Sequence, residues 1–328
     1  MGEPAGVGGE LTLAAWLRRE TEPIQPFFVI DDPVRLRKLA ARLSLEVPIE
    51  PVSNPEQVDA IFDNALPVLV QKLAADPVPG HPDPANSEPV IRSIKIAVDL
   101  ALKQQASGVV TNPIQKENLI ETGFKHPGHT EYLAELTGST PVMMLASPAL
   151  RVVPVTTHVP LMQVSDLLTT ERIVDSGKVL ASALIADFGV MKPRVAVAAL
   201  NPHGGENGIF GTEEAEIIAP AVELLSNLGI QATGPHPADS LFRASARDSY
   251  DAVLCMYHDQ ALIPLKALDF ERGVNVTLGL PIVRTSPDHG TALDLAGTSS
   301  ASAEGLISAI KMAAEIVQNR AELRASVR

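Results

Sequence analysis

Three histidines stand at the ends of short apolar runs, a position from which side chains can bind a metal ion. The runs cover 152–157, 195–200 and 252–257, and the histidines at or just past their ends are His158, His203 and His258. Apolar runs followed by helical patterns are typical of buried strands in a parallel sheet, and ligands bind outside the carboxyl ends of such strands. We therefore expect the three imidazoles at one sheet edge, within one chain or shared between two subunits.

A single histidine at a strand end is more often a hydrogen-bonded structural residue. Three repetitions of this placement, among eight histidines in the chain, favour a divalent metal site instead. Neutral nitrogen ligands with open coordination positions suit Zn²⁺ or a similar first-row cation, and open positions indicate catalysis more than scaffolding.

Other polar residues could bind a small anion. Lys266, Asn275 and Arg284 follow His258 where strand and loop patterns alternate. Two cations and an amide can bind a phosphate or a carboxylate, although each residue alone is more often a solvated surface group. Their nearness in sequence to His258 favours a joint binding role.

His129 and Thr130 begin a helical pattern. Thr130 is also placed to cap that helix, which is an ordinary structural role. A cation is disfavoured at the positive end of a helix, so we expect His129 to be a neutral imidazole that hydrogen-bonds or transfers a proton.

Three glycines, Gly6, Gly8 and Gly9, precede another helical pattern. Glycines at a helix start let backbone N–H groups approach an anion, but a tight structural turn explains them equally well. The segment is not a Walker loop, which needs Gly-Lys-Ser/Thr, and it lacks the preceding strand of a dinucleotide fingerprint.

Strand-like and helix-like segments alternate along the 328 residues, which predicts an α/β fold with a mainly parallel sheet. We expect strands at 27–30 and 108–110. Helices are expected from Pro33, over 88–105 and at the C-terminus, and five prolines make 77–89 an irregular loop.

The composition restricts the partners. A net charge of −13 argues against binding of nucleic acid, which requires a basic surface. No apolar stretch approaches the roughly 20 residues of a membrane helix and no signal-peptide pattern begins the sequence, so we expect a cytoplasmic protein without a membrane partner. Cys255 is the only cysteine, which excludes an intramolecular disulfide, and we expect it to be buried.

Seven motifs in the chain resemble, in order, those of the 4-hydroxythreonine-4-phosphate dehydrogenases of pyridoxal 5′-phosphate biosynthesis. They are Gly-Glu-Pro-Ala-Gly-Val-Gly, Pro-Gly-His-Thr-Glu, Thr-Thr-His-Val-Pro-Leu, Leu-Asn-Pro-His-Gly-Gly-Glu-Asn-Gly, Met-Tyr-His-Asp-Gln, Gly-Val-Asn-Val-Thr-Leu-Gly-Leu-Pro and Arg-Thr-Ser-Pro-Asp-His-Gly-Thr-Ala. The resemblance covers almost the whole chain. It implies NAD- or NADP-dependent oxidation of 4-phosphooxy-L-threonine to 2-amino-3-oxo-4-phosphooxybutanoate, which decarboxylates to 3-amino-2-oxopropyl phosphate.

The resemblance also implies a fold and an assembly. Two α/β/α domains would surround a central cleft, as in isocitrate and isopropylmalate dehydrogenases. Residues 1–125 with 286–328 would form the cofactor-side domain, and 126–285 the domain that carries the metal and the dimer contacts. A homodimer would place each active site at the subunit interface, with one divalent ion (Zn, Mg or Co) bound by the positions matching His158, His203 and His258 from both subunits.

The same likeness assigns roles to further residues. The family's substrate contacts match His129, Thr130, Lys266, Asn275 and Arg284, and either His129 or Lys266 would relay the proton. The segment 288–294 looks like the adenosine-binding loop of the related dehydrogenases. It implies cofactor contacts by Asp288, His289, Gly290 and Asp294.

The chain departs from the family at one place, and several rival functions stay open. Family members usually have a short strand before the Gly-Glu-Pro-Ala-Gly turn, whereas Met1 directly precedes it here, so either the natural chain is longer or one strand is missing. Related substrates are phosphorylated four-carbon sugar acids and aromatic cis-dihydrodiols. A metal-dependent hydrolase or aldolase and a non-catalytic metal or phosphate sensor are the rivals from other classes.

Overall fold

The protein is described by a computed structural model that covers residues 1–126 and 128–326. Pro127 of the Pro-Gly-His-Thr-Glu motif therefore lies outside the described residues. The chain divides into two compact units, the first made of Met1–Pro141 and Leu280–Ala314, the second of Val142–Gly279 and Glu315–Arg328. The domain boundaries expected from the resemblance stay a prediction.

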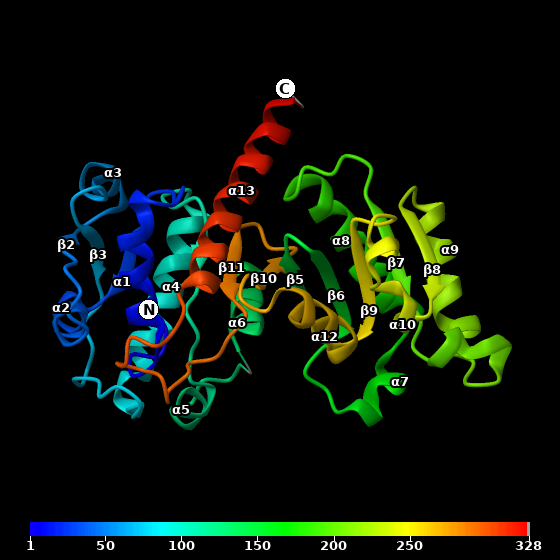
Figure 1. Cartoon of the computed structure of the whole chain (residues 1–328), viewed down its shortest axis with the longest axis horizontal. Helices are drawn as coiled ribbons and strands as arrows, with labels where there is room; N and C mark the ends of the chain where they lie inside the picture. The colour runs from blue at the N-terminus through cyan, green and yellow to red at the C-terminus, as the bar shows by residue number, and fades with distance from the viewer. Residues whose placement is uncertain (127, 327–328) are drawn as a thin grey trace. The chain divides into compact units, whose positions relative to one another are not determined.

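The first unit is built on short parallel strands. They are β1 (Val29–Asp31), β2 (Ile49–Val52), β3 (Leu66–Val70), β4 (Val109–Val110) and β11 (Arg284–Pro287). One parallel sheet has the order β1-β3-β2, of which Figure 1 labels the neighbours β2 and β3. β4 pairs in parallel with β11.

The helices of the first unit lie before, between and after these strands along the chain. They are α1 (Gly8–Leu17), α2 (Pro33–Arg42), α3 (Val58–Ile61), α4 (Ser87–Leu102), α5 (Lys116–Glu121) and α6 (His129–Thr137), with 3-10 turns η1 (Arg18–Glu20), η2 (Pro55–Gln57) and η3 (Pro84–Asn86). Asp32 caps α2 by accepting from the N–H groups of Val34 and Arg35. The last helix, α13 (Glu304–Ser326), begins in the first unit and ends in the second.

Two apolar clusters hold the first unit together. In one, Leu11 and Trp16 of α1 pack with Leu66 and Val68 of β3 and with Ile307 of α13. In the other, the apolar face of α4 packs with residues of β4 and α6. Burial of these side chains stabilises the first unit and its strands. Thr111 directly follows the carboxyl end of β4, and a loop follows that of β11.

The second unit has one larger sheet. Its strands are β5 (Val142–Ser147), β6 (Leu150–Thr156), β7 (Arg194–Ala198), β8 (Gln231–His236), β9 (Ala252–Tyr257) and β10 (Val274–Leu278), in the order β10-β5-β6-β9-β7-β8 (Figure 1). β6, β9, β7 and β8 are parallel, as the sequence predicts. β5 runs antiparallel to β6 because the chain reverses directly after Ser147, and β10 runs antiparallel to β5.

Helices cover both faces of this sheet. They are α7 (Val164–Leu167), α8 (Thr170–Ala186), α9 (Ala219–Asn227), α10 (Ala238–Leu241), α11 (Ala244–Arg247) and α12 (His258–Asp269), with 3-10 turns η4 (Leu161–Gln163) and η5 (Pro202–Gly208) and the π-helical turn η6 (Glu214–Ile218). Val152 and Val253 pack with Leu265 of α12. Val153 and Leu254 point to the opposite face and are also fully buried, and α8 packs against β6 and β9.

Most of the elements expected from the sequence are present. The expected strands at 27–30 and 108–110 correspond to β1 and β4, and the expected helices to α2, α4 and α13. α4 begins at Ser87, inside the proline-rich segment, because a proline in the first helical turn, here Pro89, needs no backbone N–H partner. Cys255 is fully buried in β9, as expected.

None of the helices in the described part of the chain has the length and apolar content that are needed to cross a membrane.

Candidate active site

The strands that precede the three histidines are neighbours in the sheet of the second unit. β9 lies between β6 and β7, with Thr156 opposite Tyr257 and Val197 opposite Leu254. All three strands run in the same direction, so their carboxyl ends meet at one edge. His158, His203 and His258 follow these ends, and this is the edge at which parallel sheets bind ligands.

His158 and His258 lie together. Their ring centroids are 5.7 Å apart, with the ring planes inclined at 46°. The Nδ1 atom of His258 is 2.7 Å from Oδ1 of Asp259. A carboxylate at one ring nitrogen fixes the tautomer and directs the other nitrogen outward, as in many metal-ligating histidines.

His203 lies in η5, in an unusual backbone conformation. Five consecutive residues, from His203 to Asn207, have φ between 43° and 77°. His158 also has a positive φ of 44°. Non-glycine residues rarely adopt this region and lose free energy in it, and such residues gather at functional sites.

The side chain of Glu214 organises the segment before His203. Its Oε1 accepts from the backbone N–H groups of Leu200 and Asn201 at 2.8 and 2.7 Å, and its Oε2 accepts from the Asn201 amide at 3.0 Å. Gly205 lies so close that an added Cβ would come within 2.7 Å of Oε2. A buried carboxylate therefore fixes the loop that carries His203.

These imidazoles fit a divalent cation as donors, but one chain does not bring all three together. Within residues 1–126 and 128–326, no group of three or more His, Cys, Asp or Glu side chains is arranged to hold a metal ion. The pair of His158 and His258 supplies two nitrogens, and the Asp259 carboxylate orients one of them. This is the arrangement expected if a second subunit supplies the third ligand.

In the first unit, His129 and Arg284 form a second polar region. His129 is the first residue of α6, and its Nε2 is buried without a hydrogen-bond partner among the described residues. Burial holds the pKa of His129 well below its usual range, and the cations of Arg284 and Lys116 lower it further. The imidazole is therefore neutral, as the sequence predicts. Thr130 follows it in α6, whose N-cap is Gly128, so the expected cap by Thr130 is wrong.

Arg284 begins β11 and is buried. Its Nη2 donates to Oγ1 of Thr111 at 2.7 Å, across the paired ends of β4 and β11. Burial lowers the pKa of Arg284 to about 10, which leaves the guanidinium charged at neutral pH. A buried cation of this kind is suited to bind an anionic group.

The N-terminal glycine turn packs against the loop after β11. An added Cβ on Gly6 would come within 2.8 Å of the Thr291 carbonyl oxygen, which also accepts from the N–H group of Val7 at 3.0 Å. The N–H groups of Ala5 and Gly6 bond to the Glu3 side chain and carbonyl. These N–H groups have protein partners, so the contacts support the structural alternative over the anion-binding one.

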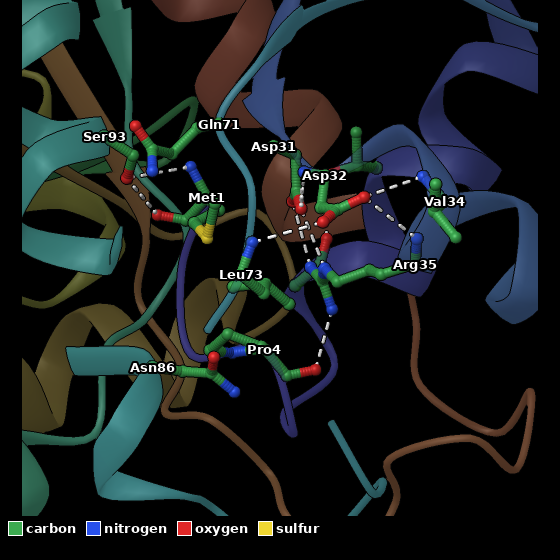
Figure 2. A network of polar contacts seen from close by, with 12 residues as sticks. Met1, Pro4, Asp31, Asp32, Val34, Arg35, Gln71, Leu73, Asn86 and Ser93 are labelled. Carbon is green, nitrogen blue, oxygen red and sulfur yellow. Dashed lines mark hydrogen bonds and ion pairs between the residues drawn. The ribbon is translucent and has the colours of Figure 1, made fainter. Parts of the chain in front are cut away.

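A buried ion pair stabilises the N-terminal glycine turn. Arg35 of α2 forms two hydrogen bonds to the carboxylate of Asp31, at 2.8 and 3.0 Å, and a third to the Pro4 carbonyl at 2.7 Å (Figure 2). An added Cβ on Gly9 would come within 3.0 Å of Arg35 Nη2, so glycine at this position makes room for the guanidinium. The pair ties the end of β1 to the glycine turn.

The remaining predicted site residues lie in both units. In the loop after β11, His289 Nδ1 is 2.9 Å from the Gly290 carbonyl, and its Nε2 is buried without a hydrogen-bond partner in the described part of the chain. In the second unit, Lys266 Nζ lies 5.7 Å from the centre of the Phe270 ring. Asn275 lies in β10, and its Oδ1 is buried without a partner among the described residues.

Several site residues could not be recognised from the sequence. Glu214 follows His203 by eleven positions but has no motif of its own. Thr111 and Asn112 follow the expected strand at 108–110 and belong to none of the seven motifs. Asn112 Nδ2 donates to Thr12 of α1 at 3.1 Å, and its Oδ1 is buried without a partner among the residues described. For Thr111 and Asn112, the one signal in the sequence was their place directly after the expected strand.

An α/β fold with imidazoles at the carboxyl edge of a parallel sheet, and a buried arginine at another strand end, is the arrangement of an α/β enzyme that binds its ligands at strand ends. Residues 23–313 match the family of the pyridoxal phosphate biosynthetic protein PdxA, and the chain belongs to this family.

The relatives align with nearly the whole chain. The 4-hydroxythreonine-4-phosphate dehydrogenase of Erythrobacter litoralis is 49% identical over 325 residues, which are 98% of this chain and 96% of the relative. That of Caulobacter vibrioides is 52% identical over 326 residues, 97% and 96% of the two chains. The crystal structure of the Klebsiella pneumoniae enzyme of that name has a TM-score of 0.86 and 37% identity, covering 97% of this chain and 96% of the other. The fold class implied by the resemblance is confirmed.

Proposed function

We propose that this protein oxidises the secondary alcohol of 4-phosphooxy-L-threonine with NAD or NADP. The alcohol carbon loses a hydride to the nicotinamide and its hydroxyl loses a proton, which gives 2-amino-3-oxo-4-phosphooxybutanoate. This β-keto acid loses CO₂ to give 3-amino-2-oxopropyl phosphate, in pyridoxal 5′-phosphate biosynthesis. The observation that carries the proposal is the near full-length match to the PdxA family.

His158, His203 and His258 are the proposed ligands of one divalent ion, which is Zn, Mg or Co. Such an ion would supply Lewis-acid polarisation of the substrate's oxygen when bound. The paired rings of His158 and His258, and the Asp259 carboxylate at His258 Nδ1, support this assignment. We assign His203 at this ion to the partner subunit, because no three possible ligands gather within the described residues of one chain.

The buried cation of Arg284 is the proposed anchor of the substrate phosphate, and Thr111 orients its guanidinium. Lys266, Asn275 and Thr130 are the other proposed substrate contacts. His129 is a proposed proton acceptor because its imidazole is neutral and its Nε2 lacks a partner among the described residues. Lys266 is the competing candidate for this role.

Asp288, His289, Gly290 and Asp294 are the proposed contacts to NAD or NADP. Support comes from the buried Nε2 of His289 and from the packing of this loop on the glycine turn. The fixed backbone of that turn would hold the loop in one conformation. The cytoplasmic location expected from the sequence stays a prediction.

Exposed apolar side chains near each histidine support a homodimer. Leu161 and Met162 follow His158 and are 71% and 88% exposed, and Ile209 follows His203 and is 74% exposed. Ile263 of α12 is 64% exposed. Exposed apolar side chains that gather in one patch mark interaction sites, and the centre of a protein interface is more apolar than the rest of the surface.

A spectrophotometric assay tests the proposed function. We expect NADH or NADPH to form from 4-phosphooxy-L-threonine, to stop after chelation and to resume when Zn²⁺, Mg²⁺ or Co²⁺ is restored. Turnover only with a phosphorylated four-carbon sugar acid or a cis-dihydrodiol would overturn the substrate assignment. Metal-dependent turnover without reduction of the nicotinamide would identify a hydrolase or an aldolase instead.

Mixing inactive variants tests the shared site. We expect His203→Ala and His258→Ala dimers to be folded and inactive, and subunit exchange between them to restore part of the activity. Sedimentation should show a dimer for both variants. No restored activity after confirmed exchange would contradict ligands drawn from two subunits.

A further inference from the structure

The backbone pairing between β7 and β9 stops before the strands reach the histidines. The paired residues are Val195 with Ala252, Ala196 with Val253, and Val197 with Leu254. If the same register continued, Ala199 would face Met256. Instead, the backbone pairing ends at Val197 and Leu254, and the two segments continue to His203 and His258.

The side chain of Gln260 occupies the place of the missing backbone pair. Its Oε1 accepts from the N–H group of Met256 at 2.7 Å, and its Nε2 donates to the carbonyl of Ala199 at 2.7 Å. One amide group thus bridges the two residues that the register would have paired. Gln260 is 7% exposed, so water does not compete for these bonds.

The other neighbour of β9 is joined to it differently. β6 stays paired with β9 up to Thr156 and Tyr257, and Thr156 Oγ1 donates to the Met256 carbonyl at 2.8 Å. His158 and His258 therefore remain close, with 5.7 Å between ring centroids. The inserted amide separates the His203 segment from this pair. On its other side, Ala199 donates its N–H group to the His236 carbonyl at 2.7 Å.

We propose that Gln260 is a positioning residue of the metal site, and that its amide sets the spacing between the segment that carries His203 and the pair of His158 and His258. The inference rests on the proposed metal ligands of the previous section. Gln260 does not touch the metal, the substrate or the cofactor in this account. It acts through the two strand ends. Because the pair of one subunit and His203 of the other are proposed to share an ion, the spacing within each chain decides whether His203 can reach the ion held by the partner's pair.

Direct metal binding tests this role. The metal-free wild-type dimer and the volume-matched variant Gln260→Met are titrated with Co²⁺, and affinity and the visible Co²⁺ spectrum are recorded. Groups that support metal ligands typically change affinity by 10- to 100-fold, so we expect Gln260→Met to bind Co²⁺ at least about tenfold more weakly, with an altered spectrum. The KM for NAD or NADP should not change.

Two further variants separate positioning from general stability. Gln260→Glu keeps an acceptor for Met256 and loses the donor to Ala199, so it should show the same loss in a side chain of nearly the same shape. Tyr250→Phe is the matched control, because the Tyr250 hydroxyl is a buried donor to the Leu241 carbonyl in the same unit, at 3.0 Å. It should lower the Tm and leave Co²⁺ affinity unchanged.

Two results would overturn the inference alone. One is wild-type affinity and spectrum in both Gln260 variants, and the other is an equal loss of affinity in Tyr250→Phe. A wild-type protein that binds no divalent ion would overturn the proposed function together with the inference. The two failures are therefore distinguishable.

Discussion

The imidazole rings of His158 and His258 lie 5.7 Å apart, at the ends of the adjacent parallel strands β6 and β9. Two strands in continuous register bring these side chains together although a hundred residues separate them in the sequence. The neighbouring strand β7 has no such register at its end, because the Gln260 amide bridges it to β9. One chain thus presents a pair of imidazoles and a separate third one.

The Asp259 carboxylate is expected to strengthen metal binding through His258. Asp259→Asn removes the negative charge at His258 Nδ1, so the ring is a weaker and less well oriented ligand. We expect Co²⁺ or Zn²⁺ affinity to fall about tenfold, measured by titration calorimetry. Asp175→Asn is the matched control, since Asp175 is a similarly exposed carboxylate that pairs with Lys178 on α8. Equal affinities for the two variants would refute the role of Asp259.

Arg284 is expected to recognise the phosphate group. Arg284→Met removes a buried cation, and a hydrogen bond to a charged group contributes about 1.5–3 kcal/mol, so KM for the phosphorylated substrate should rise about tenfold or more. Thr111→Val removes only one hydrogen bond of the guanidinium and should raise KM less. Steady-state kinetics of the wild type and of both variants measure these KM values. An unchanged KM in Arg284→Met would show that another group binds the phosphate.

His129 is expected to make folding less favourable in weak acid. Burial lowers its pKa in the folded protein, so below the ordinary value near 6.5 the unfolded chain binds a proton that the folded chain does not. Stability therefore falls as the pH drops from about 6.5 toward the lowered pKa. Urea unfolding of His129→Gln should show a weaker loss over this range than the wild type. Parallel curves for both proteins would contradict a neutral buried imidazole.

The pair of Asp31 and Arg35 is expected to be essential for the stability of the first unit. Arg35→Met leaves the Asp31 carboxylate buried without its partner, which typically costs about 3–5 kcal/mol. Lys38→Met, on the same helix, breaks only the exposed pair with Asp76 and should have a much smaller effect. Chemical denaturation measures both. Similar small changes would show that the buried pair does not hold the glycine turn.

The parallel strands of the second unit could be predicted because their signal is local. Fully buried strands need continuous apolar runs, and the runs before His158, His203 and His258 correspond to β6, β7 and β9. The antiparallel addition of β5 and β10 could not be predicted, since it depends on a tight reversal after Ser147 and on long-range pairing.

The contacts that support the site could not be predicted from the sequence either, because they too join residues that are far apart in the chain. Gln260 is 61 residues from Ala199, and Arg284 is 173 residues from Thr111. Neither pair has a local pattern, because only the folded strands bring the partners together. The candidate ligands were recognisable from their residue type and their place at strand ends, whereas the residues that hold them in position were not.

A crystal structure of the metal-loaded dimer, with anomalous scattering recorded at the metal edge, tests the central claim most directly. We expect one metal peak in each site, with imidazole nitrogens of His158, His203 and His258 at about 2.0–2.1 Å for Zn²⁺, and with both subunits contributing ligands. A peak bound elsewhere, or histidines without a common metal in the assembled dimer, would contradict the account.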